Sequence, residues 1–237
     1  MCHETMKNFK YQSIWQKGVK DKDMLKWGCA CMHSRIRSME FVVKVGTKKK
    51  AANENLTEKL AGKIIQKELK KQIGIRVNCV KQGHGNSNTG NCAKTFFRES
   101  EKSANILGIN TDIIADLGDL LNDLNSTKKC VSPTEYLKKA HGLFDRLVQH
   151  CVEYGDLSPT IHRVIHHGHL YLQRAQELGI PLGCFSESAL EMRNKDRRIS
   201  RLRFSRKTSR LNNINDIYNY LTYTSDPYLN SLKFDSN

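Results

Sequence analysis

The sequence has few of the features that mark membrane-spanning, secreted or disulfide-stabilised proteins. No apolar run approaches the roughly 18 residues of a membrane-spanning helix, and the opening MCHETMKNFK lacks the apolar core of a signal peptide. Only 4 prolines interrupt the 237 residues, and no segment shows the apolar–polar alternation of a half-buried strand. These absences predict a soluble, intracellular, mainly helical protein that does not insert into a membrane.

The cysteines also lack a recognisable pairing pattern. There are 8 of them, scattered along the chain, and none forms a Cys-x-x-Cys pair. In a chain without a secretory signal, this pattern predicts thiols with at most one metal ligand, and it argues against a disulfide framework. Cys29 and Cys31 are too close in sequence for the usual zinc knuckle, so we expect them to be structural.

Positive charge, in contrast, is in large excess. The chain has 39 Lys and Arg against 24 Asp and Glu, a net charge of +15. Because each Lys or Arg set against a phosphate releases counterions, an excess of this size favours a polyanionic partner, nucleic acid before membrane.

The densest basic stretch, residues 186–210, begins with two acidic residues, Glu187 and Glu191. They are four residues apart and therefore share one face of a helix. A carboxylate that opens a basic helix can hold a divalent metal ion beside a phosphodiester while the following turns bind the flanking phosphates. The alternative is a solvated, charge-rich helix.

Apolar residues recur at helical spacing along most of the chain. The lysine run 48–50 is expected to separate two such segments. A later segment carries four acidic residues, which are expected to form a solvated face or to pair with basic segments. The expected helices cover residues 23–45, 55–72, 106–124 and 133–154, a segment starting at Ser158, and residues 186–210; the acids are Asp112, Asp116, Asp119 and Asp123.

One glycine-rich segment, residues 83–97, resembles a phosphate-binding loop only superficially. It lacks the Gly-Lys-Ser/Thr ending of a P-loop and follows no convincing strand, so it is weak as a nucleotide site. It opens a helix whose first turn carries Lys94 and Arg98, and such a turn can hold a DNA phosphate on backbone amides. A simple helix start is the alternative.

The segment after Ser158 is rich in histidine. His162 and His166 are one helical turn apart, and His162 and His167 are five residues apart. A histidine pair at i, i+4 is a familiar zinc geometry, but no Glu follows the first histidine as in the metalloprotease motif. Surface or core histidines are the alternative.

Four segments, in order, resemble the C-terminal half of Transib-type DNA transposases, the family of the V(D)J recombinase catalytic subunit. MHSRIRSMEF resembles the family's Leu-His-x-x-Ile-Arg-x-x-Glu-Phe segment, and NSNTGNCAKTFF its Gly-Asn-Thr/Phe-Ala-Arg segment. IHRVIHHG resembles its His-Lys-x-Leu-x-His-Gly segment. The block SESALEMRNKDRRISRLRFSRKTSR, followed by TSDP, resembles the catalytic-glutamate block. The match covers most of residues 1–230 and is most specific in the last block.

The resemblance implies a catalytic role for one glutamate. In the family, a glutamate just before an Asn-Lys pair completes an Asp-Asp-Glu triad that binds two Mg²⁺ ions for DNA strand nicking and transfer. The matching residue here is Glu191, with Glu187, one turn earlier, as second choice. The family's two aspartates lie upstream of the part that this chain matches. One glutamate cannot hold two cations about 4 Å apart, so we expect residues 1–237 alone not to cut DNA.

The resemblance also implies a structural zinc ion. Its histidine ligands correspond to His162 and His167, and Cys2 matches the second cysteine of the family's Cys-x-x-Cys pair. These three fall short of the usual four ligands unless His3 or a cysteine such as Cys29 substitutes. The basic residues expected to lie on DNA are Lys94, Arg98, Arg193, Lys195, Arg197, Arg198, Arg201, Arg206 and Lys207.

The expected fold is mainly α: a helical zinc-binding insertion region plus the C-terminal catalytic-glutamate helix of an incomplete RNase H-like core. The expected divisions are a remnant of a zinc-binding linker at 1–25, a helical insertion domain at 26–182, the basic catalytic-glutamate helix at 183–210 and a C-terminal helix or tail at 211–237.

The expected function is DNA binding in the nucleus by a truncated or degenerate Transib-like transposase, or by part of a longer product. The resemblance implies that it acts as a homodimer. Two alternatives remain. One is a domesticated, non-catalytic DNA-binding protein, and the other is a zinc-stabilised helical module that binds other proteins.

Overall fold

The structure is a computed structural model that describes residues 29–78, 88–154 and 157–226. These residues are mainly helical and contain no strand, so the expectation of a mainly α protein is confirmed. None of the described helices combines the length and apolarity needed to cross a membrane. The chain divides into two compact units, residues 1–186 (unit 1) and 187–237 (unit 2). The sequence places this boundary at 182/183.

Unit 1 is organised around the long helix α4 (Cys31–Asn53). The helix continues through Gly46 and the lysine run 48–50, where the sequence predicted a break. Gly46 is kept inside the helix by packing, because a Cβ there would lie only 2.8 Å from the Leu107 side chain. The helix α5 (Glu58–Ile73) follows after a short turn, capped by Thr57 and ended by Gly74 at φ 73°, where the sequence predicted its end.

Three helices follow the segment at 79–87. They are α6 (Gly90–Arg98), α7 (Ser100–Leu107) and α8 (Thr111–Leu124). Gly108, at φ 64°, ends α7, and the Asn110 side chain caps α8 by accepting from the Asp112 amide, so the predicted helix at 106–124 is two helices. The apolar stripe of α8 is almost completely buried.

Two of the four acidic residues of α8 are partners for basic residues and the other two are exposed, which agrees with the sequence interpretation. Asp116 pairs with Arg146, and the Asp123 carboxylate lies 3.0 Å from the Lys139 ammonium. Both cations belong to α9 (Pro133–Cys151), which continues into the 3₁₀ turn η3 (Val152–Tyr154).

The rest of unit 1 is one interrupted helical segment. It consists of α10 (Pro159–His162), the π-helical turn η4 (Arg163–His167) and α11 (Gly168–Glu177), followed by the 3₁₀ turn η5 (Leu182–Phe185). Ser158 caps its start through the Ile161 amide, as the Ser-Pro-Thr sequence predicts.

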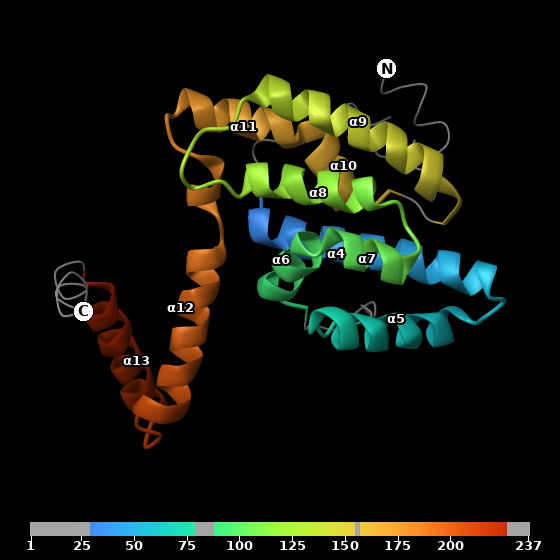
Figure 1. The fold of residues 1–237 in the computed structure, drawn as a ribbon. Coiled ribbons are helices and arrows are strands. Elements are labelled where there is room, and N and C mark those ends of the chain that lie inside the picture. The colour runs from blue at the N-terminus through green and yellow to red at the C-terminus, as the bar shows by residue number, and fades with distance from the viewer. Residues whose placement is uncertain (1–28, 79–87, 155–156, 227–237) are drawn as a thin grey trace, which may run out of the picture. The chain divides into compact units, whose positions relative to one another are not determined.

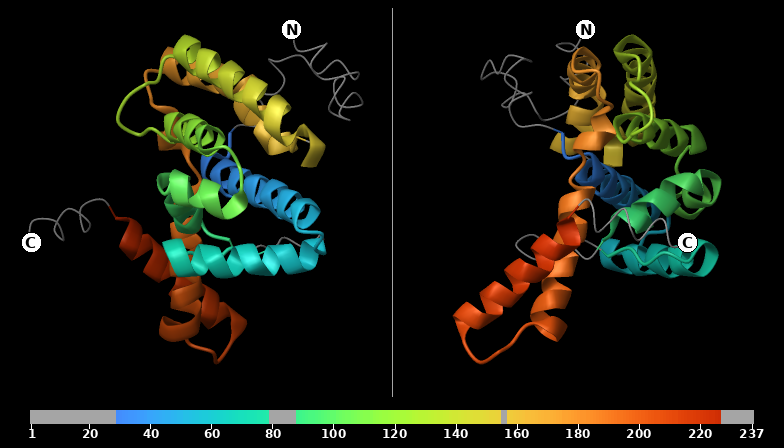
Figure 2. Two further views of the ribbon diagram at one scale, coloured as in Figure 1. Left: turned by 45° about the vertical axis from the view of Figure 1, so that its right-hand side comes forward. Right: turned by 90° about the vertical axis from the view of Figure 1, so that its left-hand side faces the viewer.

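Within unit 1 the helices form layers (Figures 1 and 2). The helices α9 and α11 lie side by side on one face, α8 and α4 form the middle, and α5 lies on the opposite face. The buried apolar residues of these helices form one continuous core. Unit 1 is therefore a helical domain whose middle helices are covered on both faces.

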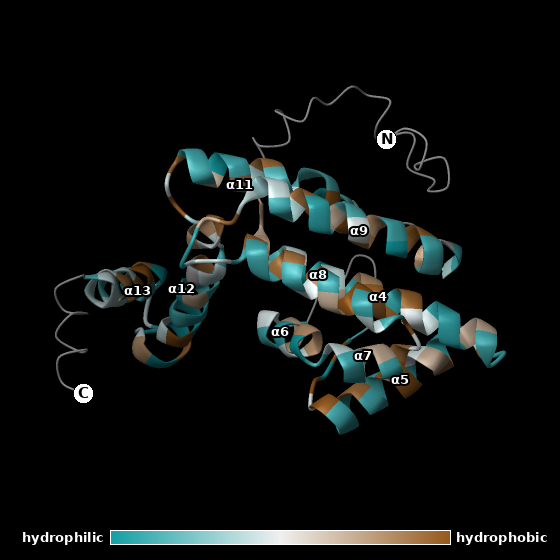
Figure 3. Cartoon of the chain, turned by 45° about the horizontal axis from the view of Figure 1, so that its top comes forward, coloured by the Kyte–Doolittle hydropathy of each residue, from teal (hydrophilic) through white to brown (hydrophobic). Residues whose placement is uncertain are grey.

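Unit 2 is a helical hairpin. The helix α12 (Ser188–Ile199) runs into the π-helical turn η6 (Ser200–Phe204), and α13 (Arg210–Ser225) returns alongside it. The α12 ribbon is mostly teal, hence hydrophilic, in Figure 3. Of the described side chains of unit 2, only that of Ser200, in η6, is buried. Unit 2 therefore has no apolar core of its own among the residues that the structure describes.

Candidate functional site

The histidine segment of unit 1 has a non-standard backbone. In an α-helix, residues five apart point about 140° away from one another, because each residue turns the helix by about 100°. The π-helical turn at Arg163–His167 has more residues per turn, and it brings His162 and His167 together. Their Nε2 atoms lie 3.2 Å apart. The sequence shows the five-residue spacing, but it does not show the π-helical turn that brings the two rings together.

This separation fits two ligands of one zinc ion. Zinc binds imidazole nitrogen at about 2.0–2.1 Å, so two nitrogens of a tetrahedral site are about 3.3 Å apart. A ligand histidine must also be neutral. Burial, followed by the neighbouring His166 and His167 rings and Arg163, lowers the pKa of His162 to about 3, so its ring is neutral at physiological pH.

His166, which lies between His162 and His167 in sequence, packs against neighbouring rings. The His166 ring lies 4.6 Å from that of His162 and 4.9 Å from that of Phe144, measured between ring centroids. His166 is thus placed between the histidine pair and α9 of the core. The i, i+4 spacing noted in the sequence brings His166 against His162 as a packing neighbour, while the facing nitrogens belong to the i, i+5 pair.

A tyrosine–glycine contact supports the π-helical turn. The Tyr136 hydroxyl of α9 donates a hydrogen bond of 2.7 Å to the Val164 carbonyl. A Cβ on Gly168 would lie 2.3 Å from the same Tyr136 oxygen, so only glycine leaves room for this contact. Tyr136 is fully buried. The His-His-Gly sequence therefore has a steric reason for its last residue.

The ligand set is not complete within the described residues. At positions 29–78, 88–154 and 157–226, no group of three His, Cys, Asp or Glu side chains is arranged to hold a metal ion. Cys2 and His3 lie outside the described residues. Cys31 is buried at the start of α4, and its thiol donates to the Cys29 carbonyl at 3.4 Å.

Unit 2 carries the glutamates and most of the basic residues that the sequence singles out. Glu187 is the N-cap residue of α12, and its carbonyl accepts a hydrogen bond from the Glu191 amide at 2.9 Å. Glu191 lies in the first turn and is exposed. The two glutamates are thus one turn apart, as their spacing predicts.

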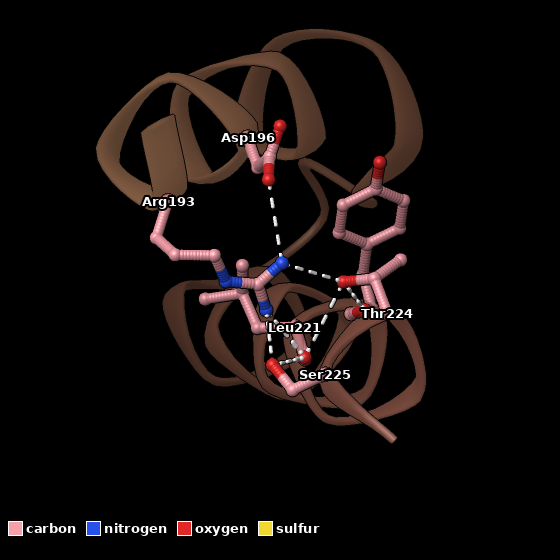
Figure 4. Close-up of polar contacts among 6 residues, drawn as sticks. Arg193, Asp196, Leu221, Thr224 and Ser225 are labelled. Atoms are coloured by element: carbon pink, nitrogen blue, oxygen red, sulfur yellow. Dashed lines mark hydrogen bonds and ion pairs between the residues drawn. The ribbon is translucent and has the colours of Figure 1, made fainter. Parts of the chain in front are cut away.

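Arg193 holds the hairpin together (Figure 4). Its guanidinium donates to the Leu221 carbonyl at 2.6 Å and to the Thr224 and Ser225 hydroxyls at 3.0 and 2.5 Å. It also lies 3.3 Å from the Asp196 carboxylate. One acceptor is thus a backbone carbonyl and two are hydroxyls, all near the C-terminal end of α13. In this structure the guanidinium of Arg193 is therefore directed at α13.

Arg206 also has an intramolecular partner. Its amide, Nε and Nη2 donate to the Asp216 carboxylate of α13 at 2.8, 3.0 and 2.8 Å. The side-chain and backbone hydrogen bonds from Arg206 lower the pKa of Asp216 to about 2. Two of the arginines expected on DNA therefore close the hairpin in this structure, which the sequence spacing could not reveal.

The face of α12 opposite to Arg193 carries both kinds of charge. Glu191, Lys195 and Arg198 are spaced i, i+4 and i+7, which places them on one side of the helix, about half a turn from Arg193. All three are exposed. None of their charged groups forms an ion pair with another described residue. Arg197, Arg201 and Lys207 are exposed in the same way.

Lys94 and Arg98 lie elsewhere, on α6 of unit 1. With Arg35 they line a cavity of about 340 Å³ beside α8. Arg98 also lies 3.5 Å from the Glu99 carboxylate. Two of the first α6 amides already bind Thr89, since the Cys92 amide donates to its hydroxyl and the Ala93 amide to its carbonyl. What is left of the predicted phosphate site is the cationic rim of this cavity, formed by Arg35, Lys94 and Arg98.

Sequence reasoning missed a buried asparagine. The Asn88 side chain accepts from the Asn78 amide at 2.8 Å and donates to the Asn78 carbonyl at 3.0 Å and to the Glu40 carboxylate at 2.8 Å. It thereby ties both ends of the 79–87 segment to α4. Its only sequence signal was a place in the segment that resembles the transposase motif.

No protein-family model matches the chain, and no curated protein is significantly similar to it in sequence.

Proposed function

We propose that this chain is the DNA-binding C-terminal part of a Transib-like transposase, and that α12 lies along the phosphate backbone of DNA. The observation that carries the proposal is the exposed face of Glu191, Lys195 and Arg198, whose charges have no ion-pair partner among the described residues. Cations left without acidic partners are available to phosphates, and phosphate contacts position a protein without reading base sequence.

Glu191 would be a metal ligand in the complete enzyme. Bound Mg²⁺ ions would supply Lewis-acid polarisation of the scissile phosphodiester. Glu191 presents an exposed carboxylate next to Lys195 and Arg198, so the same face would hold the metal and the flanking phosphates. Such a site needs further carboxylates, which the resemblance places on strands of an RNase H-like core, and we therefore propose that residues 1–237 bind DNA without cutting it.

The His162–His167 pair would hold a structural zinc ion, with Cys2 as the third ligand. The facing Nε2 atoms at 3.2 Å and the neutral His162 ring support this proposal. The ion would fasten the histidine segment to the N-terminal segment that contains Cys2. Tyr136 and Gly168 would keep the pair in position by supporting the π-helical turn.

A second candidate function is supported by the apolar residues of unit 2. Leu190, Met192 and Leu202 are each more than three-fifths exposed, and so are Phe204 and Tyr218. Exposed apolar side chains on a helical pair favour a macromolecular partner. The partner would be the remainder of an RNase H-like core, a second copy in a homodimer, or another protein if the chain is a domesticated, non-catalytic interaction module.

The direct test of DNA binding is a duplex titration at several salt concentrations with the full chain. The proposal predicts a linear fall of log affinity with log salt and a slope of several units, because each neutralised phosphate contributes about 0.9. A flat dependence contradicts DNA binding and leaves the protein-interaction function. A nuclear location would follow from a chromosomal DNA partner.

The transposase origin has a separate test in the genomic sequence upstream of the Met1 codon. The proposal predicts a coding region there with a Cys-x-x-Cys pair and two aspartates on strand-like segments. An intact, unrelated promoter at that place would contradict the origin, while leaving DNA binding by α12 open to its own measurement.

A further inference from the structure

Unit 1 contains a second basic surface, separate from Lys94 and Arg98. A groove of about 830 Å³ follows α4, with α5 as one wall and η3 with the start of α10 as the other. Four lysines line it, two from each of the paired helices. They are Lys44 and Lys48 of α4 and Lys59 and Lys63 of α5, and none is ion-paired to a residue that the structure describes.

The helix pairing places these lysines along both sides of the groove. The helices α4 and α5 run antiparallel and are joined by the short connection at 54–57 (Figure 2). Counted from the middle of this connection, Lys48 and Lys63 are equally far along their helices, Lys59 is one turn closer to it and Lys44 is one turn further away. Four residues of helix rise about 6 Å, so the two lysines of each helix are spaced by about that interval along the groove.

The acidic residues of the groove do not cancel this charge. Glu40 lies 3.0 Å from the Arg37 guanidinium and accepts a hydrogen bond from Asn88. Its charge is thus already balanced at one end of the groove. Glu58 is the one other carboxylate among the lining residues, against four lysines. The groove is therefore positive along both of its α4 and α5 edges.

The floor of the groove differs from its rim. Phe41 and Val77 lie at the bottom and are buried, while Tyr154 forms part of the opposite wall and is half-buried. A cationic rim over an apolar and aromatic floor suits a single nucleic-acid strand, whose phosphates can follow the lysines while its bases reach the floor. In a duplex the bases are stacked on one another, so their faces cannot reach such a floor.

We propose that the α4–α5 groove binds single-stranded nucleic acid through Lys44, Lys48, Lys59 and Lys63. The inference rests on the proposed function only in that both assume a nucleic-acid partner. It concerns a different unit and a different form of the nucleic acid. Duplex binding by α12 and single-strand binding by the groove therefore succeed or fail independently.

The test compares two triple variants of the full chain. The groove variant is Lys44→Gln, Lys59→Gln and Lys63→Gln. The matched control is Lys67→Gln, Lys70→Gln and Lys71→Gln, which removes the same charge from exposed lysines of α5 that do not line the groove. The probe is a fluorescein-labelled oligothymidylate, titrated at several salt concentrations.

The groove variant should bind oligothymidylate on the order of 10- to 100-fold more weakly than the control at 0.1 M salt. Its log–log salt slope should be shallower by about 2, because each lost single-strand contact removes about 0.7. Equal affinities of the two variants would overturn the proposal. A loss of polyglutamate binding with unchanged oligothymidylate binding would also overturn it and would assign the groove to an acidic peptide.

Duplex titrations of the same two variants separate this inference from the proposed function. If α12 does not bind DNA, the wild-type duplex titration fails while the groove variant still loses oligothymidylate. If the groove does not bind a single strand, duplex binding persists while the two lysine variants behave alike. Circular dichroism of both variants should show the wild-type helix content, since all six lysines are exposed.

Discussion

The two units of this chain are stabilised in different ways. Unit 1 buries a continuous apolar core from most of its helices, whereas α12 and α13 of unit 2 bury no apolar side chain that the structure describes. The two helices of unit 2 are held together instead by the polar contacts of Arg193 and Arg206 and by the stacked rings of Phe204 and Tyr220. Burial dominates folding free energy, so unit 1 should respond strongly to core substitutions and unit 2 only weakly to apolar ones.

The largest expected effect is a core truncation in unit 1. Leu117→Ala removes a fully buried side chain of α8 and should destabilise the protein by about 2–5 kcal/mol. Leu202→Ala, in unit 2, truncates a leucine that is 61% exposed and should change stability by less than about 0.5 kcal/mol. Chemical denaturation followed by circular dichroism measures both. Similar losses of unfolding free energy in both variants would show that the two units are not stabilised differently.

Two glycine-to-alanine variants test whether the contact with Tyr136 stabilises the histidine segment. Gly168→Ala pushes a Cβ into the Tyr136 hydroxyl and should cost about 1–3 kcal/mol of stability. Gly142→Ala, in α9, meets only the Arg146 guanidinium at 3.8 Å and should be neutral or stabilising by about 0.5–1 kcal/mol. Thermal unfolding of the two variants is the measurement. A neutral Gly168→Ala would show that the π-helical turn does not depend on this contact.

Metal analysis of the purified chain tests the histidine pair. The proposed site predicts about one zinc ion per chain in the wild-type protein and none in the variant His162→Ala with His167→Ala. His141→Ala with His150→Ala removes two exposed histidines of α9 and should leave the zinc content unchanged. Zinc retained by the first double variant, or absent from the wild type, would refute the site.

The smallest expected effect concerns the polar contacts of unit 2. Since the folded pKa of Asp216 is about 2, below its unfolded value of about 3.9, the Arg206 contact stabilises the hairpin above pH 4. That contribution is lost as the pH falls from about 4 to 2. A titration of the Asp216 carboxyl carbon by NMR should give a midpoint near 2, and Arg206→Gln should raise it. An ordinary midpoint in the wild type would show that the contact is not formed in solution.

Most of the helices of unit 1 could be predicted because their apolar residues recur at helical spacing and their ends carry capping residues. The Ser158 side chain caps the start of one helix, and Gly74 ends another because glycine readily adopts the left-handed conformation. The break predicted at the lysine run 48–50 was wrong, because Gly46 and its neighbours are held in α4 by packing against a distant residue, Leu107. Tertiary contacts of this kind leave no local signal.

The candidate sites were predictable in their residue types and less so in their geometry. Sequence spacing identified Glu191 and the histidines, but the approach of His162 to His167 depends on a π-helical turn that also requires Tyr136 of another helix. Arg193 and Arg206 looked the same as their basic neighbours in sequence. Their contacts with α13 depend on the hairpin, which the sequence of α12 alone does not specify.

The most direct test of the central claim is the salt dependence of duplex DNA affinity for a variant of the α12–η6 segment. The variant is Lys195→Gln, Arg198→Gln and Arg201→Gln, and the control is Lys67→Gln, Lys70→Gln and Lys71→Gln, all exposed residues. If this segment lies along DNA, its variant should bind more weakly and show a log–log slope shallower by about 3, with little change in the control. Identical slopes for the two variants would contradict the claim that α12 contacts the phosphate backbone.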